Sequence, residues 1–250
     1  YAVVGQELDM NREPARIVDL IKARRIGCMI SLVKLMESNF WGPPVVSTDS
    51  VTPWGINMWL CKSATEGFTG TVQTGYTSIG LNPTTYPNWC NWAGPYTAVA
   101  RDDLIRRLRK AATYCNFEPP VDGIPTTGTG DKWGYYTNYA VVGPMEEALE
   151  NQNDNLGNDI ASKDGMTLFR RVPIKWIAKL DADTTNPVYG INWGDFKTYV
   201  LKGWWLKETH LEHYPGQHTV QANFLDCTYQ FCMKNRRTSF ILSNGTTYPS

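Results

Sequence analysis

The order of hydrophobic and polar residues predicts a long helix over residues 14–38. Its apolar residues, such as Ile17, Leu20 and Leu32, go round the helical axis instead of keeping to one stripe. A helix that is apolar on all sides needs neighbours on more than one side. The pattern fits a central core helix, or a helix that packs on its own domain with one side and on a second subunit with the other. Gly27 is a candidate break within it.

Residues 40–100 have no helical period. Strand-like ends over 51–62 and 89–99 flank a middle that is rich in Gly, Thr and Ser. This arrangement is typical of a long two-stranded excursion with a flexible tip. Because an isolated hairpin is marginally stable in water, we expect it to lie on something, such as a neighbouring molecule. We therefore expect the tip, residues 63–87, to contribute little to the folded subunit and much to an assembly.

Residues 101–117 have the clearest helical pattern in the chain. An apolar arc at 3.6-residue spacing consists of Leu104, Ile105, Leu108, Ala111, Ala112 and Cys115, and the opposite face carries Arg106, Arg107, Arg109 and Lys110. The arc predicts a helix with one side on the core. Asp102 and Asp103 in its first turn suit the helix dipole. The basic face is interpreted first as a solvated surface, with contact to phosphate as the weaker alternative.

The second half of the chain mixes strand and helix patterns. We expect a strand in YYTNYAVVG, a helix entered at Pro144, and a strand over 172–180 with Val172, Ile174, Trp176, Ala178 and Leu180 on one face. Two further strands are expected in FLDCTYQFC and TSFILS, with Leu225, Cys227, Tyr229 and Phe231 facing inward in the first. There is no internal repeat and no recognisable linker between domains. The pattern predicts an α+β fold.

Composition adds two constraints. Lys+Arg and Asp+Glu both number 24, so the formal net charge is zero, which argues against a dedicated nucleic-acid binder and is compatible with self-association. The chain has ten Trp and thirteen Tyr, and residues 190–208 alone contain Trp193, Phe196, Tyr199, Trp204 and Trp205. Such rings fit a ring-rich core, a ligand cleft, a sugar-binding platform or a surface that binds another protein. Composition does not choose among them.

The six cysteines have no spacing of a disulfide framework, so we expect reduced, mostly buried thiols in a protein made in the cytosol. No apolar run approaches the length of a membrane span, and charges throughout residues 1–25 are unlike a signal peptide.

Three segments are weak candidates for chemistry. The first holds all three histidines, His210, His213 and His218, with Glu208 and Glu212, but its spacing matches no standard zinc motif. The oxygen-rich segment 151–164 lacks the ligand pattern of a calcium loop, and the glycines of 127–134 lack phosphate-loop spacing. Because no nucleophile motif is present either, we expect no enzyme activity, no cofactor and no metal.

Several long phrases are similar to those of one known family. They are YTNYAVVGPMEEALENQNDNLGNDIASKDG, NPVYGINWGDFKTYVLKGWW, QHTVQANFLDCTYQFCMKNRRTSFILS, DDLIRRLRKAATYCNFEPP, and the pair ATEGF and GLNPTTYPNW. Over residues 64–243 the chain resembles the major capsid proteins of tailed phages. The resemblance implies the α+β Hong Kong 97-type capsid fold, which has an N-terminal arm, an extended hairpin called the E-loop, a peripheral domain with a long spine helix, and an axial domain with a central sheet.

In this chain the implied segments are the N-terminal arm and helix at 1–50, the E-loop at 51–100, the peripheral domain at 101–118 and 201–250, and the axial domain at 119–200. The spine helix would be residues 101–117. The implied inter-subunit contacts are Phe68, Tyr76, Ile79, Leu81, Trp204 and Trp205.

The implied function is that of a major capsid protein that self-assembles into an icosahedral shell around double-stranded DNA. Its partners would be other copies of itself in hexamers and pentamers, the packaged DNA on the inner face, and portal, scaffolding and decoration proteins, with no membrane. It would be located in the virion capsid after assembly in the host bacterial cytoplasm. The alternatives are an encapsulin-like compartment shell, a carbohydrate-binding module with a Trp platform, and a metal hydrolase built on the histidine segment.

Overall fold

The computed structural model describes residues 1–4, 20–72, 76, 81–83, 85–116, 132–153, 167–210, 212–213, 215–216 and 219–249. The chain forms two compact units: unit 1 comprises Tyr1–Asn39 and Thr198–Gln230, and unit 2 comprises Phe40–Lys197 and Phe231–Ser250. The sequence showed no linker because the chain passes between the units within a helix and two strands.

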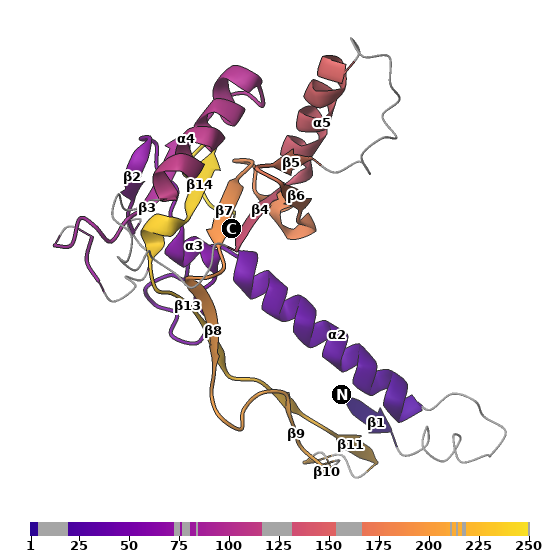
Figure 1. Cartoon of the computed structure of the whole chain (residues 1–250). Helices are drawn as coiled ribbons and strands as arrows, with labels where there is room; N and C mark the ends of the chain where they lie inside the picture. Colours follow the sequence, from indigo (N-terminus) through magenta and orange to yellow (C-terminus); the bar gives the residue numbers. More distant parts are fainter. Residues whose placement is uncertain are drawn as a thin grey trace. The chain divides into compact units, whose positions relative to one another are not determined.

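Unit 1 combines most of one long helix with short antiparallel strands (Figure 1). Helix α2 (Leu20–Trp41) is followed at once by Gly42, Pro43 and Pro44, which cannot continue a helix. It runs without a break through Gly27. The strands are β1 (Ala2–Val4), β8 (Phe196–Val200), β9 (Lys207–Glu208), β10 (Glu212–His213), β11 (Val220–Ala222), β12 (Leu225–Asp226) and β13 (Tyr229–Met233), of which β8 and β13 extend into unit 2. They pair as β1-β11-β10, β12-β9 and β13-β8. The single strand predicted in FLDCTYQFC is therefore two strands, β12 and β13.

Unit 2 is built on a seven-stranded mixed sheet with the order β2-β3-β14-β7-β4-β6-β5. Its strands are β2 (Gly67–Gly70), β3 (Asn91–Pro95), β4 (Trp133–Thr137), β5 (Leu168–Phe169), β6 (Val172–Trp176), β7 (Val188–Asn192) and β14 (Phe240–Ser243). The C-terminal strand β14 lies between β3 and β7, parallel to the first and antiparallel to the second. Every residue of β7 and β14 is buried, as expected for strands inside a covered sheet.

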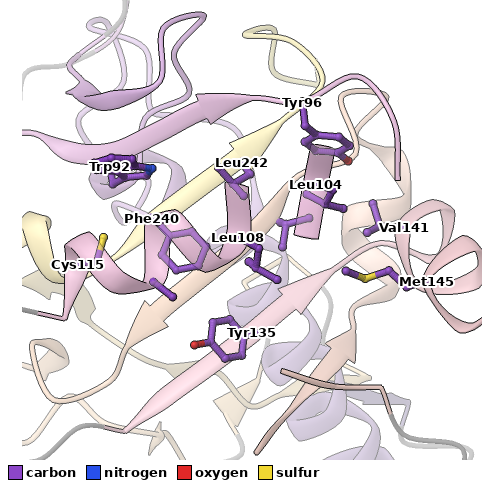
Figure 2. Packing of buried hydrophobic residues seen from close by; sticks show 13 residues of the cluster. Trp92, Tyr96, Leu104, Leu108, Cys115, Tyr135, Val141, Met145, Phe240 and Leu242 are labelled. Atoms are coloured by element: carbon purple, nitrogen blue, oxygen red, sulfur yellow. The ribbon is translucent and has the colours of Figure 1, made fainter. Parts of the chain in front are cut away.

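The helical segment Arg101–Cys115 packs on this sheet. It consists of a π-helical turn η1 (Arg101–Ile105) and the α-helix α4 (Arg106–Cys115). The predicted apolar arc is confirmed: Leu104, Leu108, Ala111, Ala112 and Cys115 are buried in one cluster with residues of β4 and β14 and of α5 (Tyr139–Asn153), and Ile105 packs against it. Figure 2 shows Leu104, Leu108 and Cys115 in this cluster together with side chains of the strands and of α5. Burying each such side chain contributes about 1.5–3 kcal/mol for a Leu and less for an Ala.

Asp103 does more than complement the helix dipole. Its carboxylate accepts hydrogen bonds from the backbone N–H groups of Thr97 and Ala98 at 2.7 and 3.0 Å and pairs with Arg107 at 2.6 Å. Burial by itself raises the pKa of Asp103, but these hydrogen bonds outweigh it and hold the pKa well below its usual range. The carboxylate thus fixes the chain between β3 and η1.

Asp103→Asn is expected to lower the melting temperature at neutral pH. Because the pKa of Asp103 is depressed in the folded state, its stabilising contribution is present above the unfolded pKa of about 4 and is lost as pH falls through the folded pKa. The difference between wild type and variant should shrink below about pH 4. Thermal unfolding measured across pH checks this, with the exposed neighbour variant Asp102→Asn as control. A difference independent of pH would contradict the assignment.

Two predicted elements near the sheet are wrong in detail. Helix α5 starts at Tyr139 and not at Pro144, which lies inside it. The first N–H group of the helix donates to Asp181 at 2.8 Å, a partner that is remote in sequence. Strand β6 ends at Trp176, whose exposed indole N–H also donates to Asp181, and a 3₁₀ helix η4 (Ala178–Ala182) replaces the rest of the predicted strand.

The segment 51–62 is not a strand. It contains a buried helical turn, α3 (Ile56–Trp59), in which the Asn57 side chain donates to the backbone oxygens of Trp41 and Gly42 and accepts a bond from the Tyr189 hydroxyl. The antiparallel stem of the predicted hairpin is formed instead by β2 and β3.

This stem belongs to the core of unit 2, so residues 67–70 at the base of the predicted tip are part of the folded subunit, while 73–75, 77–80 and 84 of the tip lie outside the described residues. The fully buried Arg236 donates to the backbone oxygens of Trp59 and Gly70 at 2.7 and 3.0 Å and to the side chain of Asn91 at 3.1 Å. One guanidinium therefore ties both strands of the stem to α3.

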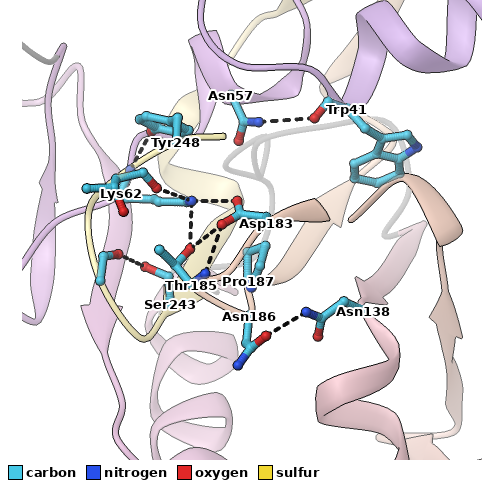
Figure 3. A network of polar contacts seen from close by, with 12 residues as sticks. Trp41, Asn57, Lys62, Asn138, Asp183, Thr185, Asn186, Pro187, Ser243 and Tyr248 are labelled. Atoms are coloured by element: carbon cyan, nitrogen blue, oxygen red, sulfur yellow. Dashed lines mark hydrogen bonds and ion pairs between the residues drawn. The ribbon is translucent and has the colours of Figure 1, made fainter. Parts of the chain in front are cut away.

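A second buried cation joins the C-terminal residues to the same unit. The ammonium group of Lys62 contacts Asp183 at 2.6 Å, Thr185 at 2.7 Å and the backbone oxygen of Thr247 at 2.7 Å (Figure 3). It also lies 4.5 Å from the centre of the Tyr248 ring. Burial lowers the pKa of Lys62, and the hydrogen bond to Asp183 opposes this shift.

Candidate assembly surface

The aromatic segment 190–208 divides into a core half and an exposed half. Trp193 stacks on Phe40 with ring centres 6.0 Å apart. The ring centre of Phe196 lies 5.5 Å from that of Phe40 and 6.1 Å from that of Phe231. Trp193 also donates its indole N–H to the Tyr136 hydroxyl at 3.0 Å. These rings form an aromatic cluster within unit 2, which confirms that part of the segment belongs to a ring-rich core.

The remaining rings are at the surface of unit 1. Trp204 and Trp205 are 40% and 47% exposed, and Tyr199 is also exposed. The turn before them is closed by a bond from the Trp204 N–H to the Leu201 oxygen at 2.9 Å, and Gly203 takes the positive φ of 80° that the turn requires. Backbone bonds with Thr228 fix both ends of this turn. Trp204 and Trp205 are therefore presented from an ordered turn.

Helix α2 has one face on its own unit and another that is open. On the inward side Arg25 forms a salt bridge with Glu208 at 2.8 Å, and Asn39 bonds to the Tyr229 hydroxyl at 3.2 Å. On another side Ile26, Ile30 and Val33 are 51%, 52% and 62% exposed. The spacing i, i+4, i+7 puts these three side chains in one stripe.

This stripe and the tryptophan turn are unusual for a free surface. Single exposed apolar residues are common, whereas a contiguous apolar stripe on an ordered helix marks a surface for interaction. Exposed Trp and Tyr favour contact with another protein, because they cover a large area at a low cost in side-chain entropy. We call the set Ile26, Ile30, Val33, Tyr199, Trp204 and Trp205 the candidate assembly surface. The sequence identified the two tryptophans but not the stripe.

The other predicted contact residues have varied surroundings. Phe68 packs on the core of unit 2, with its ring 5.1 Å from that of Trp92. Tyr76 is partly buried and lies 5.9 Å from the Tyr248 ring. Leu81 is exposed, and Ile79 lies outside the described residues. Whether a neighbouring subunit covers any of them stays a prediction.

The structure describes only part of the three segments that were candidates for a metal, calcium or phosphate site. His210 and His213 are exposed, and His218 lies outside the described residues, as do 154–164 and 127–131 of the calcium and phosphate candidates. Within the described ranges no group of three His, Cys, Asp or Glu side chains could hold a metal ion. Among the same residues no helix is long and apolar enough to cross a membrane.

All six cysteines are free thiols. Cys61, Cys90 and Cys115 are buried, and Cys28, Cys227 and Cys232 are partly buried. Burial raises the pKa of Cys61 and Cys115, so both are inert thiols at neutral pH. In this structure no two of the six cysteines form a disulfide bond.

The fold was compared with those of known proteins. A chain of the cyanophage A-1(L) capsid asymmetric unit has a similar structure with a TM-score of 0.59 and 12% sequence identity, over 99% of this chain and 76% of that chain. The chain has a phage capsid fold. A chain of the satellite phage P4 procapsid, which includes the size determination (Sid) protein, is also similar, with a TM-score of 0.53 and 11% identity over 98% of this chain and 68% of that chain.

The sequence comparisons, in contrast to the comparison of structures, find no match. No family model and no curated protein matches the chain. At 11–12% identity the similarity to these chains is one of fold. Both units take part in the capsid fold, because the similarity extends over nearly the whole chain.

Proposed function

We propose that the chain is the major capsid protein of a tailed double-stranded DNA phage and assembles into an icosahedral shell of hexamers and pentamers. The observation that carries the proposal is the similarity in fold, over 99% of the chain, to a chain of a phage capsid. The candidate assembly surface supports it, because a shell protein must leave apolar surface for its neighbours. The packaged DNA, a portal, scaffolding and decoration proteins are the further partners in this proposal, with assembly in the host cytoplasm.

Within this function we propose the Hong Kong 97-type architecture with a revised assignment of its domains. The contacts favour α2, the longest helix among the described residues, over Arg101–Cys115 as the spine helix, because α4 packs on the seven-stranded sheet. Unit 1 would then be the peripheral domain, and unit 2, with its central sheet, the axial domain. Residues 51–100 would contribute strands to the axial sheet in addition to the loop between β2 and β3.

The second candidate is an encapsulin-like shell, which would hold cargo proteins in place of DNA. A carbohydrate-binding module is less well supported, because Lys207 covers the Trp204 ring with its ammonium group 4.2 Å from the ring centre. A metal hydrolase on the histidine segment has no supporting geometry in the described part of that segment.

Electron microscopy of the expressed full chain, with nucleic-acid analysis of the particles, tests the proposal. Closed icosahedral particles are the expected result, and DNA inside virions that contain the chain separates the phage capsid from the encapsulin. A chain that remains monomeric under all assembly conditions, or particles filled with a cargo enzyme, would contradict it.

Ile30→Asp is expected to abolish shell formation without unfolding the subunit. Ile30 is half exposed, so the carboxylate stays hydrated in the free chain, but it would be buried against a neighbour in the shell at a cost of several kcal/mol. Sedimentation and thermal unfolding measured on the same sample check both statements. Ser31→Asp puts the same charge on another face of α2 and should assemble. Normal shells from Ile30→Asp would remove the stripe from the assembly surface.

A further inference from the structure

The hairpin β5–β6 has an unusual turn. Leu168 pairs with Pro173 and Phe169 with Val172, so Arg170 and Arg171 are the whole loop. Both have positive φ, 49° and 68°. A two-residue hairpin turn of this kind prefers Asn-Gly, because only Gly and a few short polar residues adopt this conformation without strain. Two arginines with positive φ therefore lower the stability of the folded chain. Strained backbone positions of this kind cluster at functional sites.

The turn is fastened to the helix above the sheet. One terminal nitrogen of Arg170, Nη2, donates to the Thr113 hydroxyl at 2.6 Å and approaches the backbone oxygen of Arg109. The hydroxyl of Thr113 in turn donates to that same oxygen at 2.9 Å. This places Arg170 and Arg171 beside the flank of α4 that carries Arg109. Arg106 lies one turn earlier on that flank, at i−3.

Lys132 lies at the same end of the seven-stranded sheet as Arg171. It directly precedes β4, and Arg171 directly precedes β6, which runs parallel to β4 with Tyr135 beside Ile174. Parallel neighbours begin at the same edge, so the two cations lie near each other.

The positive charges at this position have no carboxylate partner among the described residues. Arg106, Arg109, Lys132, Arg170 and Arg171 are all exposed, and none has a salt bridge to a carboxylate in the described part of the chain. The other flank of α4 differs, because Arg107 and Lys110 pair with Glu66 at 3.3 and 3.1 Å. The whole chain has no net charge, so the excess is local. We call these five residues the arginine-turn cluster.

We propose that the arginine-turn cluster contacts the phosphate backbone of double-stranded DNA. Guanidinium groups match phosphate in geometry and charge, and among the described residues only Nη2 of Arg170 has hydrogen-bond partners, which leaves Nε and Nη1 to donate to a phosphate. Because guanidinium and ammonium groups pair with the charge of the phosphates, the proposed contact is to the DNA backbone and carries no sequence preference. The proposal rests on the proposed function, in which the DNA is the packaged genome.

The double variant Arg170→Asn/Arg171→Gly tests the cluster while it improves the turn. Asn-Gly suits the turn, and this gain offsets the lost bond of the exposed Arg170 to Thr113, so the melting temperature should stay close to that of the wild type. Binding of the unassembled full chain to a DNA duplex of about 30 base pairs is measured by fluorescence anisotropy between about 50 and 200 mM NaCl. We expect affinity to fall at least about tenfold at the lower salt concentration and the slope of log K against log salt to decrease in magnitude by about 2.

Two further variants make the result decisive. Arg106→Gln/Arg109→Gln removes two charges of the cluster without touching the turn and should weaken binding to the same degree. Lys34→Gln/Lys202→Gln removes two exposed charges from unit 1 and should bind DNA as the wild type does. Unchanged affinity and salt slope in both cluster variants, or an equal loss in the unit 1 control, would overturn the proposal.

Shell formation by the same variants separates this proposal from the proposed function. Intact shells with weakened DNA binding support both. Loss of shells with unchanged DNA binding would assign the cluster to a contact between subunits and overturn the DNA contact. If the wild type itself forms no shells, the proposed function fails irrespective of how the cluster binds DNA.

Discussion

Leu108→Asp is expected to unfold unit 2. Leu108 is fully buried at the centre of the cluster between α4 and the seven-stranded sheet. The substitution removes most of the packing of a leucine and puts a carboxylate among apolar side chains with no partner, which together cost at least about 4 kcal/mol. A domain is stable by roughly 5–15 kcal/mol, so most or all of its stability would be lost. Insoluble protein, or the absence of a cooperative thermal transition, is the expected measurement.

Arg109→Ala is the matched control on the same helix. Arg109 is exposed, so its removal should change the melting temperature little. Soluble shells from Leu108→Asp in wild-type yield would mean that α4 does not pack as described. Loss of folding in Arg109→Ala would mean that the opposite face is also buried.

Helix α4 could be predicted almost completely from the sequence, and its case explains why other elements could not. Its apolar arc packs on one side only, against the sheet and α5, so the 3.6-residue period alone identifies the buried face. The beginning of α5 depends on Asp181, which supplies a partner for its first N–H group from 42 residues away. No local pattern includes such a contact, and Pro144 gave a misleading start signal.

Of the predicted hairpin only the second strand is correct: β3 lies within the predicted 89–99, whereas β2 takes the place of the predicted strand at 51–62, and the environment of the hairpin also differs from the prediction. Its composition is that of an exposed loop, but a buried arginine 166 residues after Gly70 joins it to the core. The charged residue Arg236 would not be assigned to a core on sequence grounds, since arginine is rarely buried without partners. Its partners here are backbone oxygens that only the folded chain brings together.

The candidate assembly surface was predictable in part. The apolar circumference of α2 indicated two packing partners, but not which face meets which partner. The contacts of Arg25 and Asn39 decide this, because they fix the inward side and leave Ile26, Ile30 and Val33 open. The turn at Arg170 and Arg171 had no sequence signal, because a turn with positive φ at both positions is normally indicated by Asn-Gly.

The second large effect concerns the buried ion pair of Lys62 and Asp183. Both side chains are almost inaccessible to solvent, and each has further partners: Lys62 bonds to Thr185 and the Thr247 oxygen, and Asp183 accepts from the N–H and hydroxyl of Thr185. Breaking such a pair leaves one charge buried without compensation, which costs about 3–5 kcal/mol, whereas replacing both partners is much less costly. The pair also holds the last residues of the chain against unit 2.

Lys62→Met should therefore lower the stability of unit 2 by about 3–5 kcal/mol and release the C-terminal residues. Lys62→Met/Asp183→Asn removes both charges, and the amide oxygen can still accept from Thr185, so the double variant should recover more than half of the loss. Denaturant unfolding of the four proteins of this cycle gives the coupling energy, and limited proteolysis at the C-terminus reports whether the end of the chain is released. A double variant as unstable as the sum of the two single variants would mean that the two charges do not act as a pair. A small effect of Lys62→Met, below about 1 kcal/mol, would mean that water reaches Asp183 once the ammonium group is gone.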